Sequence, residues 1–331
     1  MKQTVLVIGG AGYIGSHTAY LLSMQYHVIV LDALLHGQTF PHAWATLVRG
    51  DYGDEVLLAR LFTQYHIDAV MHFAGHIEVG ESVCNPLAYY QNNVANTITL
   101  LRVMRTYNCN TLIFSSSCAV YGVPLYTPID EEHQHNPISP YGKTKAMIEQ
   151  LLRDCSHAYG LKYVGLRYFN AAGALPEHGL CEQHQPETHL IPLLIRAAYQ
   201  HTPFSIFGTD YDTQDGTCMR DFLHVVDIAS AHMKALTYLQ QGNTPVFLNL
   251  GTGQGVSVKQ MIQAVQESTG FAINSVEKPR REGDPAVLVA NASQAAVLLG
   301  WRPQNSDLEG MIRSALPGNH MSREQQQSMS R

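Results

Sequence analysis

The sequence predicts an α/β fold, a Rossmann-like doubly wound parallel sheet followed by a smaller C-terminal α/β domain. Three observations lead to this prediction. The chain opens with a buried strand, a glycine-rich loop and a helical pattern. Short apolar strands then alternate with amphipathic helical segments as far as about residue 170, the pattern of parallel βαβ units. Beyond residue 171 loop residues and short elements dominate, which places a domain boundary there.

Length and composition are those of an ordinary globular protein. A chain of 331 residues suggests two domains, and 45% hydrophobic residues are enough for sizeable cores. The net charge of −6 argues against nonspecific nucleic-acid binding, so local arginines must bind any anionic ligand. The six cysteines include no C-x-x-C pair, which favours a reduced, cytoplasmic location. Because no run of about 18 apolar residues occurs, we expect no membrane span and no membrane partner.

The N-terminal segment has the pattern of a dinucleotide-binding loop. Residues 5–8 form a continuous apolar run, and a helical pattern follows the glycines. Gly10, Gly12 and Gly15 match G-x-G-x-x-G, and Gly9 extends the match to the wider spacing G-x-x-G-x-x-G. Missing side chains let the backbone approach a pyrophosphate held at a helix N-terminus. The residues expected to contact the dinucleotide here are Gly9, Gly12, Tyr13, Ile14 and Gly15.

Asp32 indicates which dinucleotide is bound. It ends the next predicted strand, 27–31, where a carboxylate can hydrogen-bond the adenosine ribose. The same carboxylate repels a 2′-phosphate, and no lysine or arginine follows it before Arg49. We therefore predict NAD rather than NADP as the cofactor. Asp51, after the next short strand, is expected to reach the adenine, unless it only caps the helix that begins near Asp54.

Two further strands bring small and polar residues to the same edge of the sheet. Strand 69–73 leads into Ala74-Gly75, a small-residue turn that suits a backbone running close to a ligand. Strand 112–114 delivers Ser115-Ser116-Ser117 to the carboxyl ends of the parallel strands, where ligands of such sheets bind. Ser117 is expected to donate a hydrogen bond to a substrate oxygen, although serines after a strand also serve as turn formers.

Tyr141 and Lys145 form the candidate catalytic pair. Ser139-Pro140 ahead of them is typical of a helix cap followed by proline in the first turn. Residues four apart share a helix face, so the ammonium can stand beside the phenol and lower its pKa from about 10. Tyr141 would then be a usable general base. The alternative is a surface tyrosine beside a solvated lysine.

The second half of the chain is expected to return to the sheet before it ends. Strand 163–166 continues the alternation of the first half. Helices are predicted over 86–107, 140–158, 189–200 and 224–240, and a buried strand over 246–250. We assign residues 1–171 to a NAD-binding Rossmann domain, to which 224–250 returns, and residues 172–331 to a substrate domain with a disordered tail, 319–331.

Histidine is abundant, at 17 residues, and the segment 131–135 (Glu-Glu-His-Gln-His) raises the question of a metal site. It lies in a polar loop flanked by proline, without helix-spaced ligands. We therefore predict a solvated loop there and no metal.

Taken together, these motifs resemble the extended short-chain dehydrogenase/reductase superfamily. As far as about residue 315 the chain is more specifically similar to the UDP-glucose 4-epimerase family. Many segments in the same order carry the similarity: Gly9 to His17, Phe73-Ala74-Gly75, Val79-Gly80-Glu81-Ser82, Asn92-Asn93, Leu166 to Asn170, Asp215-Gly216-Thr217, Arg220 to Val225 and Pro279 to Asp284.

The resemblance implies a role for each matching position. Tyr141 is the acid/base, Lys145 holds the cofactor ribose and tunes the tyrosine, and Ser117 hydrogen-bonds the sugar hydroxyl at C4. Planar guanidinium groups match phosphate oxygens, which suits the diphosphate of a UDP-hexose. The implied diphosphate contacts are Asn170, Arg220 and Arg281, with Phe207 on the uracil and Asp284 on the uridine ribose. Further implied cofactor contacts are Tyr52, Phe73, Ala74, Gly75, Asn93, Ser115 and Tyr168, and further substrate contacts are His189, Leu190 and Leu288.

The implied function is a NAD-dependent UDP-glucose/UDP-galactose 4-epimerase that transfers hydride reversibly through a 4-keto sugar. The implied assembly is a homodimer in which helices 86–107 and 140–158 form a four-helix interface. One alternative is a nucleotide-sugar 4,6-dehydratase, which would need Asp-Glu where this chain has Cys118-Ala119. A second is a non-catalytic NAD-sensing binding protein, which would not need Ser117, Tyr141 and Lys145 together.

Some positions depart from the family pattern. Ile77 stands where some members have lysine near the nicotinamide, and Thr188-His189 stands where some have two asparagines. Leu288 replaces a tyrosine that in some members narrows the sugar pocket, so we expect N-acetyl sugars to be accepted as well. By itself, Arg280-Arg281 would also fit a solvated surface pair.

Overall fold

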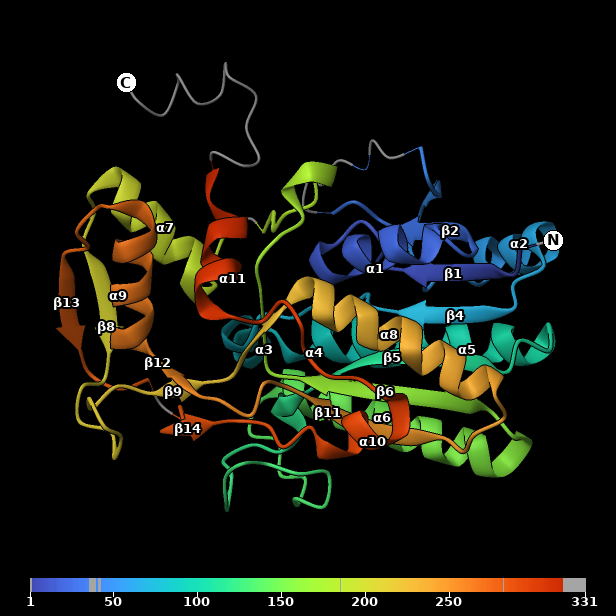
Figure 1. The fold of residues 1–331 in the computed structure, drawn as a ribbon. Helices are drawn as coiled ribbons and strands as arrows, with labels where there is room; N and C mark the ends of the chain where they lie inside the picture. The colour runs from blue at the N-terminus through green and yellow to red at the C-terminus, as the bar shows by residue number, and fades with distance from the viewer. Residues whose placement is uncertain (1, 36–39, 41–42, 185, 282, 318–331) are drawn as a thin grey trace.

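A seven-stranded, wholly parallel sheet forms the larger part of the computed structural model (Figure 1). The structure describes residues 2–35, 40, 43–184, 186–281 and 283–317, so the predicted tail 319–331 lies outside the described residues. The strand order is β11-β6-β5-β4-β1-β2-β3. The strands are β1 (Thr4–Ile8), β2 (His27–Asp32), β3 (Thr46–Arg49), β4 (Ala69–His72), β5 (Thr111–Ser117), β6 (Lys162–Tyr168) and β11 (Val246–Leu250).

Alternate strand residues face two hydrophobic cores, because side chains along a strand point to opposite faces. Val5, Val7 and Val30 pack in one core, which is covered by α1 (Tyr13–Ser23), α8 (Val225–Gln240) and α10 (Ser293–Leu299). Leu6, Ile8 and Leu31 pack in the other, which is covered by α2 (Glu55–Tyr65), α5 (Asn96–Thr106) and α6 (Pro140–Tyr159). The predicted doubly wound sheet is therefore confirmed. The strand order reverses between β1 and β4, the point at which such sheets bind ligands.

The segment 86–107 is helical, as predicted, but it is not one continuous α-helix. The chain forms α3 (Val79–Cys84), then α4 (Pro86–Tyr89), a π-helical stretch (Tyr90–Ala95) and α5. The π-helical stretch holds the Asn93 amide against two other segments, as described below, and such stretches occur frequently at functional sites.

The smaller part of the molecule lies beyond the carboxyl ends of the strands, on the left in Figure 1. Its core is built on α7 (Leu190–Gln200), α9 (Val258–Thr269) and α11 (Leu308–Ala315). The short paired strands are β7 (Asn170–Ala172) with β10 (Phe222–His224), β8 (Phe204–Phe207) with β13 (Ser275–Lys278), and β9 (Met219–Arg220) between β12 (Val256–Ser257) and β14 (Val287–Leu288).

The chain returns to the larger part twice, whereas the sequence suggested only the return of residues 224–250. Helix α8 and strand β11 return to the sheet, and α10 then packs on α8 and β11 as well. Ala295, Leu299 and Trp301 are buried in that core, and the Trp301 indole N–H donates to the Asp227 carbonyl at 3.0 Å. The described helices include none that is long and apolar enough to cross a membrane.

Candidate active site

The glycine loop lies at the carboxyl end of β1, and two of its glycines are required by close packing. Gly9 has φ +76°, and a Cβ there would lie 2.5 Å from the Ala74 amide nitrogen. A Cβ on Gly15 would lie 2.1 Å from the Gly9 carbonyl oxygen. Gly12 is the residue before α1, and its Cβ would meet only the Gly9 carbonyl, at 3.3 Å. The loop therefore brings a backbone without side chains to the first turn of α1, which begins with Tyr13 and Ile14, and a helix N-terminus favours an anionic group.

Asp32 braces this loop from the end of β2. Its carboxylate accepts hydrogen bonds from the Ala11 N–H at 3.0 Å and the Leu34 N–H at 2.9 Å. One oxygen thus fixes the glycine loop, and the same carboxylate remains partly exposed at the sheet edge. This is the position that the sequence predicted for a ribose-binding carboxylate.

Asp51 does not cap helix α2, so that alternative is wrong. The cap is Asp54, whose carboxylate accepts from the Val56 and Leu57 N–H groups, both at 3.0 Å. The Asp51 carboxylate instead accepts from the Gly53 N–H at 2.7 Å and remains exposed. The neighbouring Tyr52 is buried, and its hydroxyl donates to the Asn92 carbonyl.

Asn93 joins the loop after β4 to the helix that carries Tyr141. Its side-chain oxygen accepts from the His76 N–H at 2.8 Å, and its amide donates to the His76 carbonyl at 3.0 Å and to the Thr144 hydroxyl at 3.1 Å. The same oxygen would lie 3.2 Å from a Cβ on Gly75, so a larger residue there would crowd it. Phe73, before this turn, packs against the His232 ring at 4.6 Å between centroids.

Ser117, Tyr141 and Lys145 are brought together at the carboxyl end of β5. The Ser139 hydroxyl caps α6 by accepting from the Gly142 N–H at 3.1 Å, and Pro140 occupies the first turn, as predicted. The Ser117 hydroxyl lies near enough to the Tyr141 phenol to lower its pKa. The Ser117 oxygen also accepts from the Ala119 N–H at 3.2 Å, so this serine both forms the turn and faces the phenol.

Lys145 is buried below the tyrosine and points at the sheet. Its ammonium donates to the Ser115 carbonyl at 2.7 Å and lies 5.8 Å from the centre of the Tyr141 ring. It also lies 5.0 Å from the centre of the Phe114 ring. The alternative of a solvated lysine is therefore wrong.

In the protein alone, the pKa of Tyr141 is not lowered. Burial raises it to about 12, opposed by the Ser117 hydroxyl. Burial also lowers the pKa of Lys145 to about 8, against the opposing effect of the Glu149 carboxylate. Helical spacing alone overestimated the influence of the ammonium, because Lys145 is directed to a backbone carbonyl. A phenolate here would need a further positive group beside it.

Lys145 should make the stability of the protein depend on pH. Its pKa in the folded chain, about 8, lies below its ordinary value of about 10.4, so the unfolded chain binds more protons between these values. Stability therefore rises with pH through this window. We expect Lys145→Met to be more stable than the parent at pH ~7 by about 1–3 kcal/mol, and this gain to shrink by pH ~9.5. Urea unfolding at both pH values measures it, with exposed Lys143→Met as the matched control. A gain that does not change with pH would contradict the assignment.

A buried ion pair lies one helical turn beyond Lys145, and sequence reasoning missed it. Both oxygens of the Glu149 carboxylate accept from the Arg167 guanidinium, at 2.8 and 2.6 Å, and the side chains are 0% and 2% exposed. The Ser116 hydroxyl donates to Glu149 at 2.6 Å, and Arg167 donates to the Tyr121 hydroxyl at 2.8 Å. The signal was available, because Tyr141, Lys145 and Glu149 repeat at four-residue spacing on one helix face. At the ends of the same two strands, β5 and β6, the Ser115 and Tyr168 hydroxyls share a hydrogen bond.

The predicted substrate contacts come from the smaller part and the strands next to it. Arg220 donates to the Asp284 carboxylate, so the two residues expected to hold a diphosphate and a ribose are paired with each other. The Arg281 guanidinium lies 4.1 Å from the centre of the Phe207 ring. The Asn170 amide donates to the Asp221 carbonyl at 2.8 Å, between β7 and β10.

Leu288 and Arg280 complete this side of the site. Leu288 packs on the cluster of Val120, Tyr121 and Ile129, together with Cys118 beside Ser117, as a sugar-pocket wall would. Arg280 is not simply solvated, because it pairs with Asp210 at 2.7 Å and lies 4.3 Å from the centre of the Tyr211 ring.

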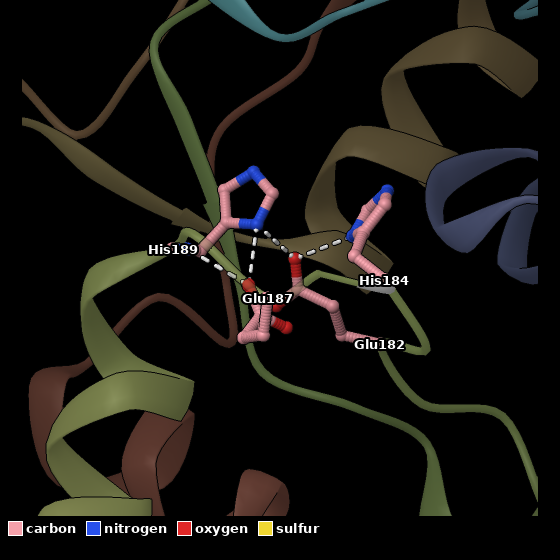
Figure 2. Close-up of side chains that lie close together, drawn as sticks. All are labelled: Glu182, His184, Glu187 and His189. Atoms are coloured by element: carbon pink, nitrogen blue, oxygen red, sulfur yellow. Dashed lines mark hydrogen bonds and ion pairs between the residues drawn. The ribbon is translucent and has the colours of Figure 1, made fainter.

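A cluster of two glutamates and two histidines precedes α7, and sequence reasoning missed this as well (Figure 2). His189 Nδ1 lies 2.7 Å from Glu182 and 2.9 Å from Glu187. Burial lowers the pKa of His189, but the two carboxylates outweigh it and raise the pKa to about 10. The signal was the repeated spacing Glu-x-His, at 182–184 and 187–189.

The segment 131–135 is only partly the solvated loop that we predicted. Glu131 accepts from the Asn249 N–H at 2.8 Å, and His133 is 3% exposed, with Nε2 2.9 Å from the Leu125 amide. Buried backbone groups need these side chains as partners.

Comparisons with known proteins agree with this geometry. A family model described as the NAD dependent epimerase/dehydratase family matches residues 5–251. A UDP-glucose 4-epimerase of Halalkalibacterium halodurans is 46% identical over 315 residues, 95% of this chain and 94% of the relative. The structure of a UDP-glucose 4-epimerase from Brucella ovis in complex with NAD is 45% identical and has a TM-score of 0.93, covering 97% of this chain and 99% of that one. A UDP-Glc/GlcNAc 4-epimerase from Campylobacter jejuni is 38% identical with a TM-score of 0.84, covering 96% and 99%.

Proposed function

Because the chain belongs to the NAD dependent epimerase/dehydratase family, we propose that it epimerises UDP-hexoses at C4 by reversible hydride transfer through a 4-keto sugar. It is an enzyme that uses NAD and interconverts UDP-glucose and UDP-galactose. The relatives that support this activity are named UDP-glucose 4-epimerases. We assign NAD to residues 1–171 together with 224–250, and the UDP-hexose to residues 172–331.

The residues present fit NAD. Without a side chain, Gly12 would let a pyrophosphate approach the start of α1, and Asp32 would bind the adenosine ribose. Asp51 and Tyr52 would flank the adenine. The loop Phe73-Ala74-Gly75, held by Asn93, would run along the rest of the cofactor, with Lys145, Ser115 and Tyr168 below it. When bound, NAD supplies the hydride acceptor and a positively charged nicotinamide ring.

Tyr141 removes the proton from the C4 hydroxyl while hydride leaves C4, and Ser117 orients that hydroxyl. A positive charge beside the phenol is the group that the protein alone lacks, so the pKa of Tyr141 should fall from about 12 on cofactor binding. The 4-keto sugar would then rotate in the site, hydride would return to the opposite face of C4, and Tyr141 would return the proton to the C4 oxygen. Positioning and electrostatics, with no covalent intermediate, carry the catalysis.

The UDP portion would be held by side chains that pair among themselves in the protein alone. Arg220 must exchange Asp284 for phosphate oxygens, which leaves Asp284 for the uridine ribose. Arg281, which lies over the Phe207 ring in the protein alone, would turn to the diphosphate and leave Phe207 to the uracil. Asn170 and the start of α7 at His189-Leu190 would face the diphosphate.

The convergence of Ser117, Tyr141 and Lys145 at the carboxyl end of β5 carries this proposal. It also separates the proposal from the two alternatives. The dehydratase acid/base pair is missing, since burial raises the pKa of the Cys118 thiol to about 12 and Ala119 has no titratable group. A protein that only senses NAD needs no such set.

The cofactor test uses the purified protein as it is. The purified protein should carry NAD. It should convert UDP-galactose to UDP-glucose with no stoichiometric build-up of free NADH, because hydride returns to the same sugar. Continuous NADH release matched by an oxidised sugar would identify a net dehydrogenase instead.

Leu288 predicts a broad sugar pocket. Leucine lacks the ring and hydroxyl of tyrosine, so UDP-GlcNAc and UDP-GalNAc should be interconverted as well. The Campylobacter relative is named a UDP-Glc/GlcNAc 4-epimerase, which supports this proposal. Leu288→Tyr should lower kcat/KM for the N-acetyl sugars at least about 100-fold by steric overlap and leave UDP-galactose within a few-fold. Leu288→Met, with a similar volume, is the control. If the parent protein does not turn over N-acetyl sugars, the pocket is not open.

We also propose a homodimer and a cytoplasmic location. Leu87, Ile98 and Met147 are apolar residues exposed on α4, α5 and α6, 79%, 42% and 45% respectively, as a four-helix interface would require. Light scattering should give twice the chain mass at micromolar concentration, and a monomer would exclude the dimer. All six cysteines are free thiols, as in a reducing compartment.

A further inference from the structure

The loop before α7 brings four metal-ligating side chains to one point. The atoms that could bind an ion, one from each of Glu182, His184, Glu187 and His189, all lie within 4.8 Å of one another. Figure 2 shows both imidazoles and both carboxylates turned towards a common centre. No other group of three or more such residues is found in the part of the chain that the structure describes.

The spacing of these atoms is close to that of a tetrahedral site. Glu182 Oε1 lies 2.7 Å from His189 Nδ1 and 3.0 Å from His184 Nδ1, and Glu187 Oε1 lies 2.9 Å from His189 Nδ1. Zinc bonds of about 2.0–2.1 Å to nitrogen and oxygen place neighbouring ligand atoms about 3.4 Å apart. The shortest contact, 2.7 Å, would open by about 0.7 Å, and the longest separation, up to 4.8 Å, would close by as much as about 1.4 Å, so the loop must contract around the ion.

The charges of the cluster also favour a cation. The Glu182 and Glu187 side chains are 9% and 6% exposed. Among the residues that the structure describes, their only ion-pair partners are the two histidines, since no lysine or arginine lies within 4.0 Å. Buried carboxylates require a compensating positive charge. The histidines supply it in the protein alone, and a divalent ion with two neutral imidazoles would supply it in their place.

We propose that Glu182, His184, Glu187 and His189 bind a divalent transition-metal ion of the Zn²⁺ type, which imidazole nitrogen and carboxylate oxygen suit. The ion would take no part in proton or hydride transfer, because the cluster contains no residue of the Ser117-Tyr141-Lys145 set, and through His189 it would also fix the start of α7, which we place beside the diphosphate. It would hold the loop between the first turn of α1 and the start of α7. His184 packs edge-on against the Tyr13 ring at 6.5 Å, and the Tyr13 hydroxyl donates to the Gly173 carbonyl at 2.5 Å.

The test uses the full-length protein, stripped with a chelator and dialysed, and ZnCl₂ as the probe. Calorimetric titration should give one ion per chain, and Co²⁺ in its place should give the intense visible bands of a tetrahedral site. His184→Ala and Glu187→Gln should each weaken Zn²⁺ binding at least about 100-fold, the upper range for the loss of even an indirect partner of a metal site. Exposed His157→Ala, on α6, is the matched control and should bind as the parent does.

Zn²⁺ should also raise the melting temperature of the parent and of His157→Ala but not of His184→Ala. Melting curves in chelator show whether each variant is folded, and Glu187→Gln provides a second variant should one fail to fold. No stoichiometric Zn²⁺ binding by the parent at tens of micromolar, or equal affinity in the two ligand variants, would overturn the proposal. Epimerase activity is not part of this readout, so the metal site and the proposed function can fail separately.

Discussion

Tyr141→Phe is expected to lower the epimerase rate by about 10² to 10⁴, the usual range for the loss of a general acid/base. The substitution removes only the phenol oxygen. That oxygen lies near the Ser117 hydroxyl and is the group that we propose to deprotonate the C4 hydroxyl. The ring remains in the first turn of α6, so folding and NAD content should persist. Steady-state rates with UDP-galactose, together with the NAD content of the purified variant, measure both effects.

A distant tyrosine gives the control for this substitution. Tyr199 lies at the end of α7, where it packs on Phe271 at 5.4 Å between ring centroids. Tyr199→Phe also removes one phenol oxygen and should keep near-full activity. If Tyr141→Phe were equally active, Tyr141 would not be the acid/base, and the mechanism would be wrong.

Glu149→Gln is expected to destabilise the protein by about 3–5 kcal/mol, because it leaves the Arg167 guanidinium buried without its counter-ion. Glutamine has the shape of glutamate but offers only one oxygen acceptor, while Arg167 donates to both carboxylate oxygens. The free energy of unfolding from urea denaturation measures the loss. The same change should reduce activity, since Ser116 and the segment that carries Ser117 are fixed by this carboxylate.

An exposed ion pair of the same kind serves as the control. Glu309 pairs with Arg313 at 2.5 Å, but the side chains are 64% and 67% exposed. Solvent screens such a pair, so Glu309→Gln should change the unfolding free energy by less than about 1 kcal/mol. If Glu149→Gln cost no more than Glu309→Gln, the buried pair would not be what holds the ends of β5 and β6 together.

Periodicity predicted the sheet well and the long helix less well. Continuous apolar runs such as residues 5–8 fall on buried parallel strands, where both faces of the sheet are covered. The helix over 86–107 has the right apolar spacing, but its π-helical stretch depends on the contacts of Asn93 with His76 and Thr144, which lie far away in sequence. The packing of α10 on α8 and β11 likewise follows from tertiary contacts.

In the site, local motifs were predictable and the pairing of charges was not. The glycine loop, Asp32, Ser117 and Tyr141 each belong to one short segment whose position at the sheet edge follows from the fold. The direction in which Lys145 points depends on a carbonyl of another strand, so helical spacing predicted the wrong sign for the pKa of Tyr141. Arg220 with Asp284, and Glu149 with Arg167, join residues that no local pattern connects.

The most direct test of the proposed mechanism follows one hydrogen atom. UDP-galactose carrying deuterium at C4 is incubated with the purified protein without added cofactor, and the sugar is read by proton NMR. Hydride transfer to bound NAD and back predicts UDP-glucose that still carries deuterium at C4. Absence of UDP-glucose, or a product in which hydrogen from solvent has replaced the deuterium, would contradict transfer through a 4-keto sugar and the bound cofactor.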